Sequence, residues 1–335
     1  MASFSQFGND LYTGKRSFDF VARRKIWFSI AAIMVAAAIV VPFLRGGFIF
    51  GIEFSGGSEF TVSNPATQAD GSIDQSLASD AVIAVVPNAT PKISIVNGGS
   101  AVRVQTDLLD NTESDTIRDS LATAYDVSTD EVTSSFIGAT WGADITRQAL
   151  TALIVFILLA AIVMALYFRT WKMSVAALIA LFHDLIITAG VYGILGFEVT
   201  PAAVIGFLTI LGYSLYDTVV VFDKIRENTN EGTSRTFGDS VNLAVNQTLV
   251  RSINTSVVAL LPIGSILFIG AVVLGAGTLR DISLALFIGV LVGTYSTIFI
   301  AAPLYATFRQ GETIVRDSDK KKTAIAARTT TGAVR

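Results

Sequence analysis

The sequence predicts an α-helical integral membrane protein with six transmembrane helices and one extracytoplasmic α+β domain between the first two helices. Its 335 residues are 52% hydrophobic and only 15% charged, and the mean hydropathy is +0.60. Uninterrupted apolar runs reach the roughly 20 residues that a helix needs to cross a bilayer. These runs lie at residues 26–44, 145–168, 173–195, 199–222, 252–274 and 282–306.

Residues 1–25 form a polar N-terminal segment that ends in Arg23, Arg24 and Lys25, directly before the first apolar run. This order predicts a signal anchor whose N-terminus is cytosolic. A cleavable signal peptide is the alternative, because residues 36–38 are three alanines. The anchor is favoured because the run at 26–44 is longer than the roughly 7 to 15 apolar residues of a signal peptide.

Residues 45–144 have the composition of a water-soluble domain, and their pattern predicts the order βαββαβ of a ferredoxin-like fold. A first strand is expected in 48–62, with a bend at Gly56 and Gly57. The spacing Ser72-x-x-Gln75 is that of a capping box and predicts a helix that runs through Val85. About 100 residues are enough to form a hydrophobic core.

The second half of this domain repeats the pattern. Apolar alternation on both sides of Asn-Gly-Gly at 97–99 is typical of a β-hairpin. The spacing Thr112-x-x-Asp115 predicts the start of a second helix, and 132–137 predicts the closing strand. One face of that helix is expected to carry Ile117, Leu121 and Tyr125.

The distribution of Lys and Arg predicts the orientation. Threading six spans from a cytosolic N-terminus leaves six basic residues outside: Arg45, Lys92, Arg103, Arg118, Arg147 and Arg280. The other 18 of 24 fall in the N-terminal segment, the short turn before 173, the segment from Lys224 to Arg251 and the basic tail 309–335. This bias agrees with the positive-inside rule and predicts that both termini are cytosolic.

The cytosolic loop 223–250 is expected to be helical at both ends around a turn near 231–232. One face would carry Phe237, Val241, Ala244, Val245 and Thr248. An amphipathic helix on the membrane surface, or one packed on the bundle, explains this pattern better than a catalytic role. The tail after Arg309 is expected to be disordered and to contact anionic lipid or another partner, or only to enforce topology.

Composition excludes most enzyme chemistry. The chain has no cysteine and one histidine, His183, so thiolate sites, disulfides and most metal sites are absent. It also lacks the Gly-x-x-x-x-Gly-Lys-Ser/Thr loop of nucleotide hydrolases. We therefore expect no enzyme activity, no cofactor and no nucleic-acid partner. The work would come from a partner or from the membrane potential, which is worth about 2.3 kcal/mol per charge per 100 mV.

Asp217 is an ionisable residue inside the fourth apolar run, where a carboxylate costs about 2.5 to 3.5 kcal/mol on insertion scales. Arg251 lies at the start of the fifth run, so antiparallel spans would place it at a similar depth. The pair would be a proton switch, in which Arg251 holds Asp217 ionised and protonation releases it. A fixed ion pair that locks two helices together is the alternative, and the switch is favoured.

His183 and Asp184 form a second polar pair, in the middle of the third run. A hydrogen-bonded pair between helices and a second station on a proton path explain it equally well. Gly206 and Gly212 in the fourth run are expected to permit close packing or bending rather than to bind a ligand.

Two function classes remain for these residues. A proton-coupled transport or translocation subunit is favoured. An intramembrane aspartyl protease is the alternative, because Tyr216-Asp217 matches half of that motif, but the required Gly-x-Gly-Asp is absent from the next run. Spans that only anchor the outer domain would leave Asp184, Asp217 and Arg251 unexplained.

Three motifs resemble the SecF family of preprotein-translocase subunits. Residues 51–58, Gly-Ile-Glu-Phe-Ser-Gly-Gly-Ser, are similar to the family motif Gly-Ile-Asp-Phe-x-Gly-Gly, with Gly51, Glu53, Gly56 and Gly57 at its defining positions. Residues 212–228 resemble the family's fourth-span signature, and 246–256 resemble the start of its fifth span. The similarity runs from about residue 20 to 308. Glu53 replaces the usual Asp, and Tyr216 stands where Asn commonly precedes the Asp.

This resemblance implies a member of the resistance-nodulation-division superfamily in the bacterial cytoplasmic membrane. Such a subunit works beside SecD and the SecYEG channel and uses the proton gradient to complete export of unfolded preproteins. The family's proton-path Asp and Arg map onto Asp217 and Arg251. A proton-coupled exporter of the same superfamily with another substrate is the alternative.

Overall fold

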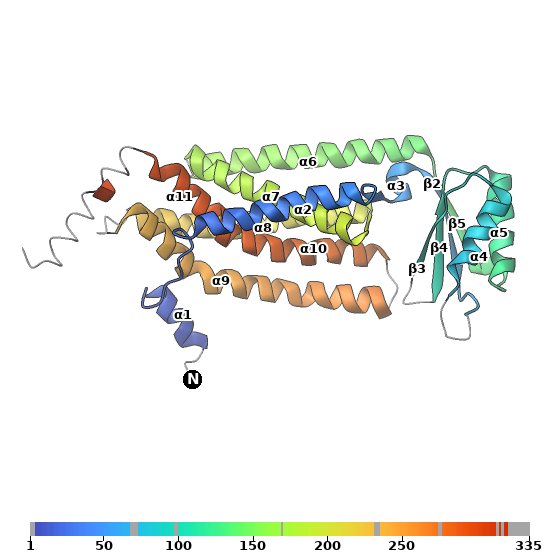
Figure 1. Ribbon diagram of the computed structural model, residues 1–335, viewed down its shortest axis with the longest axis horizontal. Helices are drawn as coiled ribbons and strands as arrows, with labels where there is room; N and C mark the ends of the chain where they lie inside the picture. Colours follow the sequence, from blue (N-terminus) through green and yellow to red (C-terminus); the bar gives the residue numbers. More distant parts are fainter. Residues whose placement is uncertain are drawn as a thin grey trace, which may run out of the picture.

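The computed structural model is an elongated helical bundle with an α+β domain at one end (Figure 1). It describes residues 4–67, 73–96, 100–168, 170–230, 235–273, 277–312, 315 and 318–320. Within these residues, six helical stretches are long and apolar enough to cross a membrane. They run over Arg24–Leu44, Thr140–Phe168, Trp171–Leu195, Pro201–Asn230, Phe237–Gly270 and Thr278–Gln310.

The six predicted spans are therefore confirmed as helices, and several extend further than their apolar runs. They comprise α2 (Arg24–Leu44), α6 (Ala139–Phe168), α7 (Trp171–Leu195), α8 (Pro201–Asn230), α9 (Phe237–Ser265) with the π-helical η3 (Ile266–Val273), and α10 (Gly277–Ser296). The last span continues through a second π-helical segment, η4 (Thr297–Ala301), into α11 (Ala302–Gln310). A short N-terminal helix, α1 (Phe4–Tyr12), packs on α9.

The loop predicted at 223–250 is mostly continuous helix. Because α8 extends to Asn230 and α9 begins at Phe237, only six residues connect them, and 231–234 lie outside the described residues. The predicted face is buried, from Val241, Ala244 and Val245 at 0% exposure to Thr248 at 7% and Phe237 at 8%. The alternative in which this segment packs on the bundle is therefore confirmed.

The α+β domain has the predicted βαββαβ order. Its elements are β2 (Gly57–Ser63), α4 (Gln75–Val85), β3 (Lys92–Val96), β4 (Ala101–Thr106), α5 (Asn111–Ala124) and β5 (Val132–Ile137). The sheet order is β3-β4-β2-β5, and every pair of neighbours is antiparallel. A short 3-10 turn, η2 (Thr129–Glu131), precedes β5. In Figure 1 the helices α4 and α5 cover the face of the sheet that points away from the bundle.

The two helix starts in this domain differ from the prediction. The cap of helix α5 is Asp110, two residues before the expected Thr112. Asp110 and Glu113 form the capping box: Asp110 Oδ1 accepts the Glu113 N–H at 2.7 Å, and Glu113 Oε2 accepts the Asp110 N–H at 3.0 Å. Helix α4 begins at Gln75 with Asp74 as its cap, and Asp74 Oδ1 accepts the Ser76 N–H. Ser72 and the hairpin turn at 97–99 lie outside the described residues.

The expected first strand, 48–62, is divided. Residues Ile49–Phe50 form β1, Ile52–Ser55 form the short helix α3, and only then does β2 begin. Gly56 and Gly57 have φ values of +73° and +140°, so the expected bend is real and has glycine geometry. Strand β1 pairs in parallel with β6 (Glu198–Val199), which lies between α7 and α8. This pairing ties the base of the α+β domain to the bundle.

Candidate functional site

Helices α7, α8 and α10 form the enclosed centre of the bundle, and small residues let them approach closely. A Cβ placed on Gly206 of α8 would lie 2.6 Å from the Cβ of Ala285 on α10. A Cβ placed on Gly293 would lie 3.1 Å from the Cβ of Ser214. Small residues at helix crossings are typical of membrane bundles, where close backbone packing replaces hydrophobic driving force. Gly206 thus has the predicted packing role, whereas Gly212 has no neighbour within 4 Å.

Asp184 on α7 lies in the middle of this enclosed region and is 1% exposed. Its Oδ2 accepts hydrogen bonds from the hydroxyls of Ser214 at 2.5 Å and Ser296 at 2.8 Å, which come from α8 and α10. Its Oδ1 lies 3.1 Å from Nδ1 of His183. One carboxylate therefore joins all three helices.

His183 is the neighbour of Asp184 and is also buried, at 6% exposure. Its Nδ1 faces Asp184, its ring lies 6.2 Å from that of Tyr295, and its Nε2 has no hydrogen-bond partner among the described residues. The predicted pair is thus in direct contact. The pair places the imidazole ring of His183 beside a carboxylate that accepts several hydrogen bonds.

Asp217 lies on α8 one turn beyond Ser214 and is 6% exposed. The Ser252 hydroxyl of α9 donates to its Oδ1 at 2.9 Å. Its Oδ2 is buried and has no hydrogen-bond partner among the described residues. Next to it, the hydroxyls of Thr218 and Thr297 lie 2.9 Å apart. Asp217 therefore has one fixed oxygen and one that is available to a proton or to water.

Arg251 is close to Asp217 in the fold but forms no ion pair with it among the described residues. Its Nη2 lies 3.5 Å from the hydroxyl of Tyr216, and both side chains face outward from the bundle. Successive residues of a helix point about 100° apart, so Ser252 reaches Asp217 while Arg251 meets α8 further out, at Tyr216. The expected direct pair is thus replaced by a serine contact, and the fixed ion-pair lock is not formed in this structure.

The glycine-rich motif after the first span lies at the junction between bundle and α+β domain. Gly51 N–H donates to the Val199 carbonyl at 2.9 Å, and the Glu53 carboxylate folds back against Gly51, in the space that a Cβ would need. A Cβ placed on Gly57 would lie 2.5 Å from the Thr106 carbonyl oxygen. These glycines are therefore required by close approach, and Gly56 by its positive φ.

A charged cluster around Glu53 was not foreseen from the sequence. Gln105 Nε2 donates to Glu59 Oε2 at 3.0 Å and to Glu198 Oε1 at 2.9 Å, which joins the sheet of the domain to β6 of the bundle. Arg103 lies 3.6 Å from Glu59 and 3.9 Å from Glu198. The one sequence signal for this cluster was Glu198, a lone charge in the short connection between two apolar runs.

Electrostatics at this junction favour the neutral form of Glu53. Burial raises the pKa of the Glu53 carboxyl, and the carboxylates of Glu198 and Glu59 raise it further. Its own backbone N–H and the Arg103 guanidinium act in the opposite direction but do not cancel the rise. The Arg103 guanidinium thus interacts with three carboxyl groups, those of Glu53, Glu59 and Glu198.

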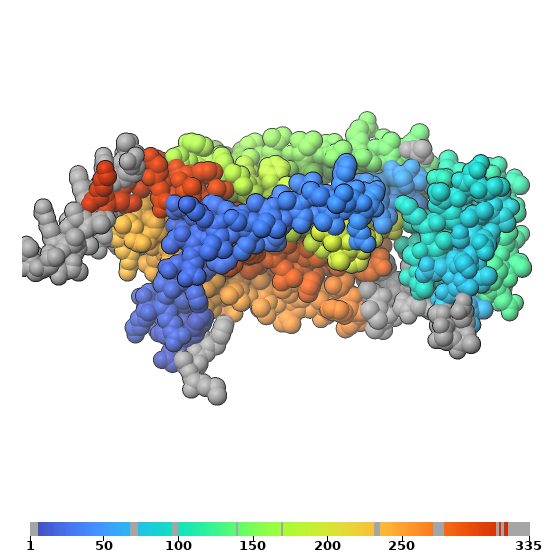
Figure 2. Space-filling view, viewed as in Figure 1, coloured from blue at the N-terminus to red at the C-terminus, as the bar shows by residue number. Residues whose placement is uncertain are grey.

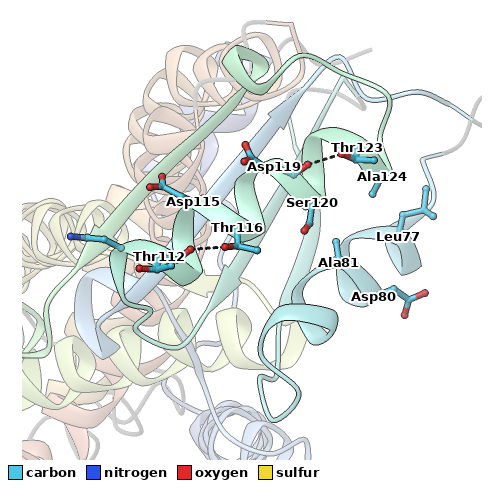
Figure 3. Close-up of a pocket in the computed structure, with 11 residues that line it drawn as sticks. Leu77, Asp80, Ala81, Thr112, Asp115, Thr116, Asp119, Ser120, Thr123 and Ala124 are labelled. Carbon is cyan, nitrogen blue, oxygen red and sulfur yellow. Dashed lines mark hydrogen bonds between the residues drawn. The ribbon is translucent and has the colours of Figure 1, made fainter.

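The α+β domain also has a groove of about 740 Å³ between α4 and α5 (Figure 3). Its sides carry Asp80, Asp115 and Asp119, and Leu77 and Ala81 line it from α4. Among the residues that the structure describes, no group of three or more His, Cys, Asp or Glu side chains could hold a metal ion.

Comparison with known proteins identifies the family. Residues 116–311 match the family model of the C-terminal region of the protein export membrane proteins SecD and SecF. The chain is 43% identical to the protein translocase subunit SecF of Streptomyces coelicolor, over 93% of this chain and 82% of the relative. It is 40% identical to the SecF subunit of Mycobacterium tuberculosis, over 94% of this chain and 72% of the relative.

A solved structure agrees with these relatives. The crystal structure of Thermus thermophilus SecDF, described as a translocon-associated membrane protein, matches with a TM-score of 0.74 and 29% identity. The match covers 88% of this chain but only 39% of the SecDF chain, so this chain spans well under half of that protein. The chain therefore belongs to the SecF family of protein translocase subunits, within the SecD/SecF group of protein export membrane proteins.

Proposed function

We propose that this chain uses the proton gradient across the bacterial cytoplasmic membrane to drive late steps of preprotein export. Its partners would be a SecD-like subunit and the SecYEG channel, and its substrate the unfolded preprotein. The family membership establishes the role in protein export; the energy source, the partners and the orientation are the proposal. None of the relatives named above is an exporter of another kind, and nothing in the site favours one.

The observation that carries the proposal is Asp217. Asp217 is a carboxylate buried between α8 and α9, with one oxygen held by Ser252 and the other without a partner among the described residues, so it can accept a proton without first breaking an ion pair with any of them. Because a charge in the membrane is costly, gaining or losing that proton changes how favourably the helices pack.

Asp184 would be the second station on this path. Ser214 donates to Asp184 and precedes Asp217 by one turn on α8, so a shift of α8 moves Asp217 together with a hydrogen-bond donor of Asp184. The hydroxyl pair of Thr218 and Thr297 also joins α8 to the last span. In this mechanism Asp217 takes up and releases the proton, the hydroxyls orient the carboxylates, and Arg251 supplies a positive charge nearby at the surface of the bundle.

The outer domain would face the cell exterior and both termini the cytosol, as the charge distribution predicts. A SecD-like partner would supply the part of the assembly that the SecDF structure has and this chain lacks. In support, the chain covers 39% of SecDF, and α6 exposes large apolar side chains along its length, for example Ile154 at 57%. Such a surface is suited to lipid or to another helix.

Asp217→Asn tests the proposal in inverted membrane vesicles that contain the full assembly. The amide keeps the shape but binds no proton, so we expect gradient-stimulated preprotein export to fall to the level seen without a gradient. Asp144→Asn is the control, because Asp144 is exposed on α6 and pairs with Arg147 at 3.4 Å. Full gradient-stimulated export by Asp217→Asn would overturn the proton role, while a loss of export without a gradient would indicate a folding defect.

A further inference from the structure

A cavity of about 460 Å³ opens at the end of the bundle opposite the α+β domain. Four helices form it: Tyr12 of α1, Tyr167 of α6, and the facing sides of α8 and α9. Helix α1 closes one side because it packs on α9, where Gln247 donates to the Tyr12 carbonyl at 3.1 Å. Figure 2 shows this N-terminal segment lying against the end of the bundle.

The cavity lies at the level of lipid headgroups. Tyr12, Tyr167 and Trp171 are exposed at 55%, 49% and 69%, and the last two mark the end of α6 and the start of α7. Exposed tyrosine and tryptophan at the ends of spans are typical of the membrane interface. Val219 and Val220 of α8 add apolar lining to the cavity.

Two of the four charged side chains in the cavity neutralise each other. Lys224 Nζ lies 2.6 Å from Glu227 Oε1 and 5.7 Å from the centre of the Tyr12 ring. The other two, Arg251 and Asp223, are exposed and form no ion pair among the described residues. The cavity therefore offers one guanidinium, in contact only with the Tyr216 hydroxyl, and one carboxylate, both without an ion pair among the described residues.

We propose that this cavity binds the headgroup of a phospholipid that carries a primary ammonium group, with its phosphate on Arg251 and its ammonium on Asp223. A guanidinium binds phosphate through two parallel hydrogen bonds, and an ammonium donates to a carboxylate. The two free charges are of opposite sign, as in a zwitterionic headgroup. A purely anionic headgroup would leave Asp223 without a cationic partner and would place negative charge beside it. A choline headgroup has no N–H group to donate to Asp223.

Lipid binding is a different task from proton transfer, although Arg251 takes part in both proposals. Ser252, the next residue, holds Asp217, so a lipid phosphate on Arg251 would fix the start of this turn of α9. The test measures binding rather than export, so its result does not depend on the proposed function.

The full chain, purified in detergent, would be mixed with equal amounts of phosphatidylethanolamine, phosphatidylglycerol and phosphatidylcholine, and retained lipid would be counted by native mass spectrometry. We expect preferential retention of phosphatidylethanolamine. Loss of the charge-assisted contact should weaken retention at least about tenfold in Asp223→Asn and in Arg251→Gln. Asp19→Asn, exposed at the same end of the molecule but not lining the cavity, should retain the lipid.

Three results would overturn the proposal: equal retention of all three lipids, retention that both variants leave unchanged, or retention of phosphatidylglycerol alone. Inorganic phosphate and ethanolamine, added separately at the same concentration, distinguish a lipid site from a site for a free ion. Competition by either one at that concentration would also count against it. The melting temperature of each variant separates lost binding from lost folding.

Discussion

The two carboxylates at the centre of the bundle, Asp184 and Asp217, differ in their hydrogen-bond partners. Asp184 is saturated with donors from two other helices, whereas Asp217 has one donor and one oxygen without a partner among the described residues. The sequence shows two intramembrane carboxylates of similar cost. Their partners distinguish them: Asp184 links three helices through its hydrogen bonds, whereas Asp217 has an oxygen that no described residue holds.

Ser214→Ala tests the structural part of this distinction. It removes the 2.5 Å hydrogen bond to Asp184 and leaves a buried carboxylate with fewer donors, which should cost about 1 to 3 kcal/mol in unfolding free energy. Thermal unfolding in detergent measures the loss. Thr209→Ala on the same helix is the control, because Thr209 is at the exposed surface and bonds only to its own helix at Ile205. An equal effect of both substitutions would refute the assignment.

The bounds of the helices α8 and α9 are only partly visible in the sequence. The apolar runs predict that helices exist, but not that α8 continues to Asn230 or that α9 begins at Phe237, because polar residues in these extensions resemble a loop. The apolar stripe of α9, from Phe237 to Thr248, correctly indicated a helix. Packing of that stripe on the bundle determines where the helix lies.

A pair of glycines on α8 provides a matched test of helix packing. Gly206→Ala would place a methyl group 2.6 Å from Ala285 of α10, so α8 and α10 must separate, at a cost of about 1 to 3 kcal/mol. Gly212→Ala meets no atom within 4 Å and should be neutral or stabilise the helix by up to about 1 kcal/mol. Equilibrium unfolding of both variants gives the comparison, and the reverse order would show that the α8–α10 contact is wrong.

At the scale of the whole molecule, the Glu53 junction connects the two lobes. Gln105 of the domain donates to Glu198 of the bundle, and the nearby Glu53 carboxyl has a raised pKa. The charged groups facing Glu53 are Glu59, Arg103 and Glu198, while Asp144 and Arg147 on the neighbouring α6 pair with each other and are exposed. Protonation of Glu53 removes its repulsion from two carboxylates.

This arrangement predicts that the junction is tighter at low pH. Because the pKa of Glu53 is raised when the junction is formed, its contribution is complete below the ordinary glutamate pKa of about 4.3 and is lost as pH rises through the raised value. Spin labels on Leu108→Cys and Leu195→Cys, in a chain with no native cysteine, report the separation of the lobes. We expect the distance distribution to broaden with rising pH.

Glu53→Gln should remove this pH dependence and keep the narrow distribution throughout, because the amide imitates the protonated acid. Glu131→Gln is a control on the far side of the domain, in the turn η2. A broadening that persists unchanged in Glu53→Gln would assign the effect to another group.

The sequence by itself determined the number of spans, the βαββαβ order and the family, because apolar length, strand alternation and a long specific motif are local properties of the chain. It also identified His183, Asp184, Asp217 and Arg251, since charge in an apolar run is visible without a fold. Tertiary structure decided their partners. Which way a side chain points depends on helix rotation and crossing, so Asp217 contacts Ser252 instead of Arg251, and Glu53 meets Glu198 from 145 residues away.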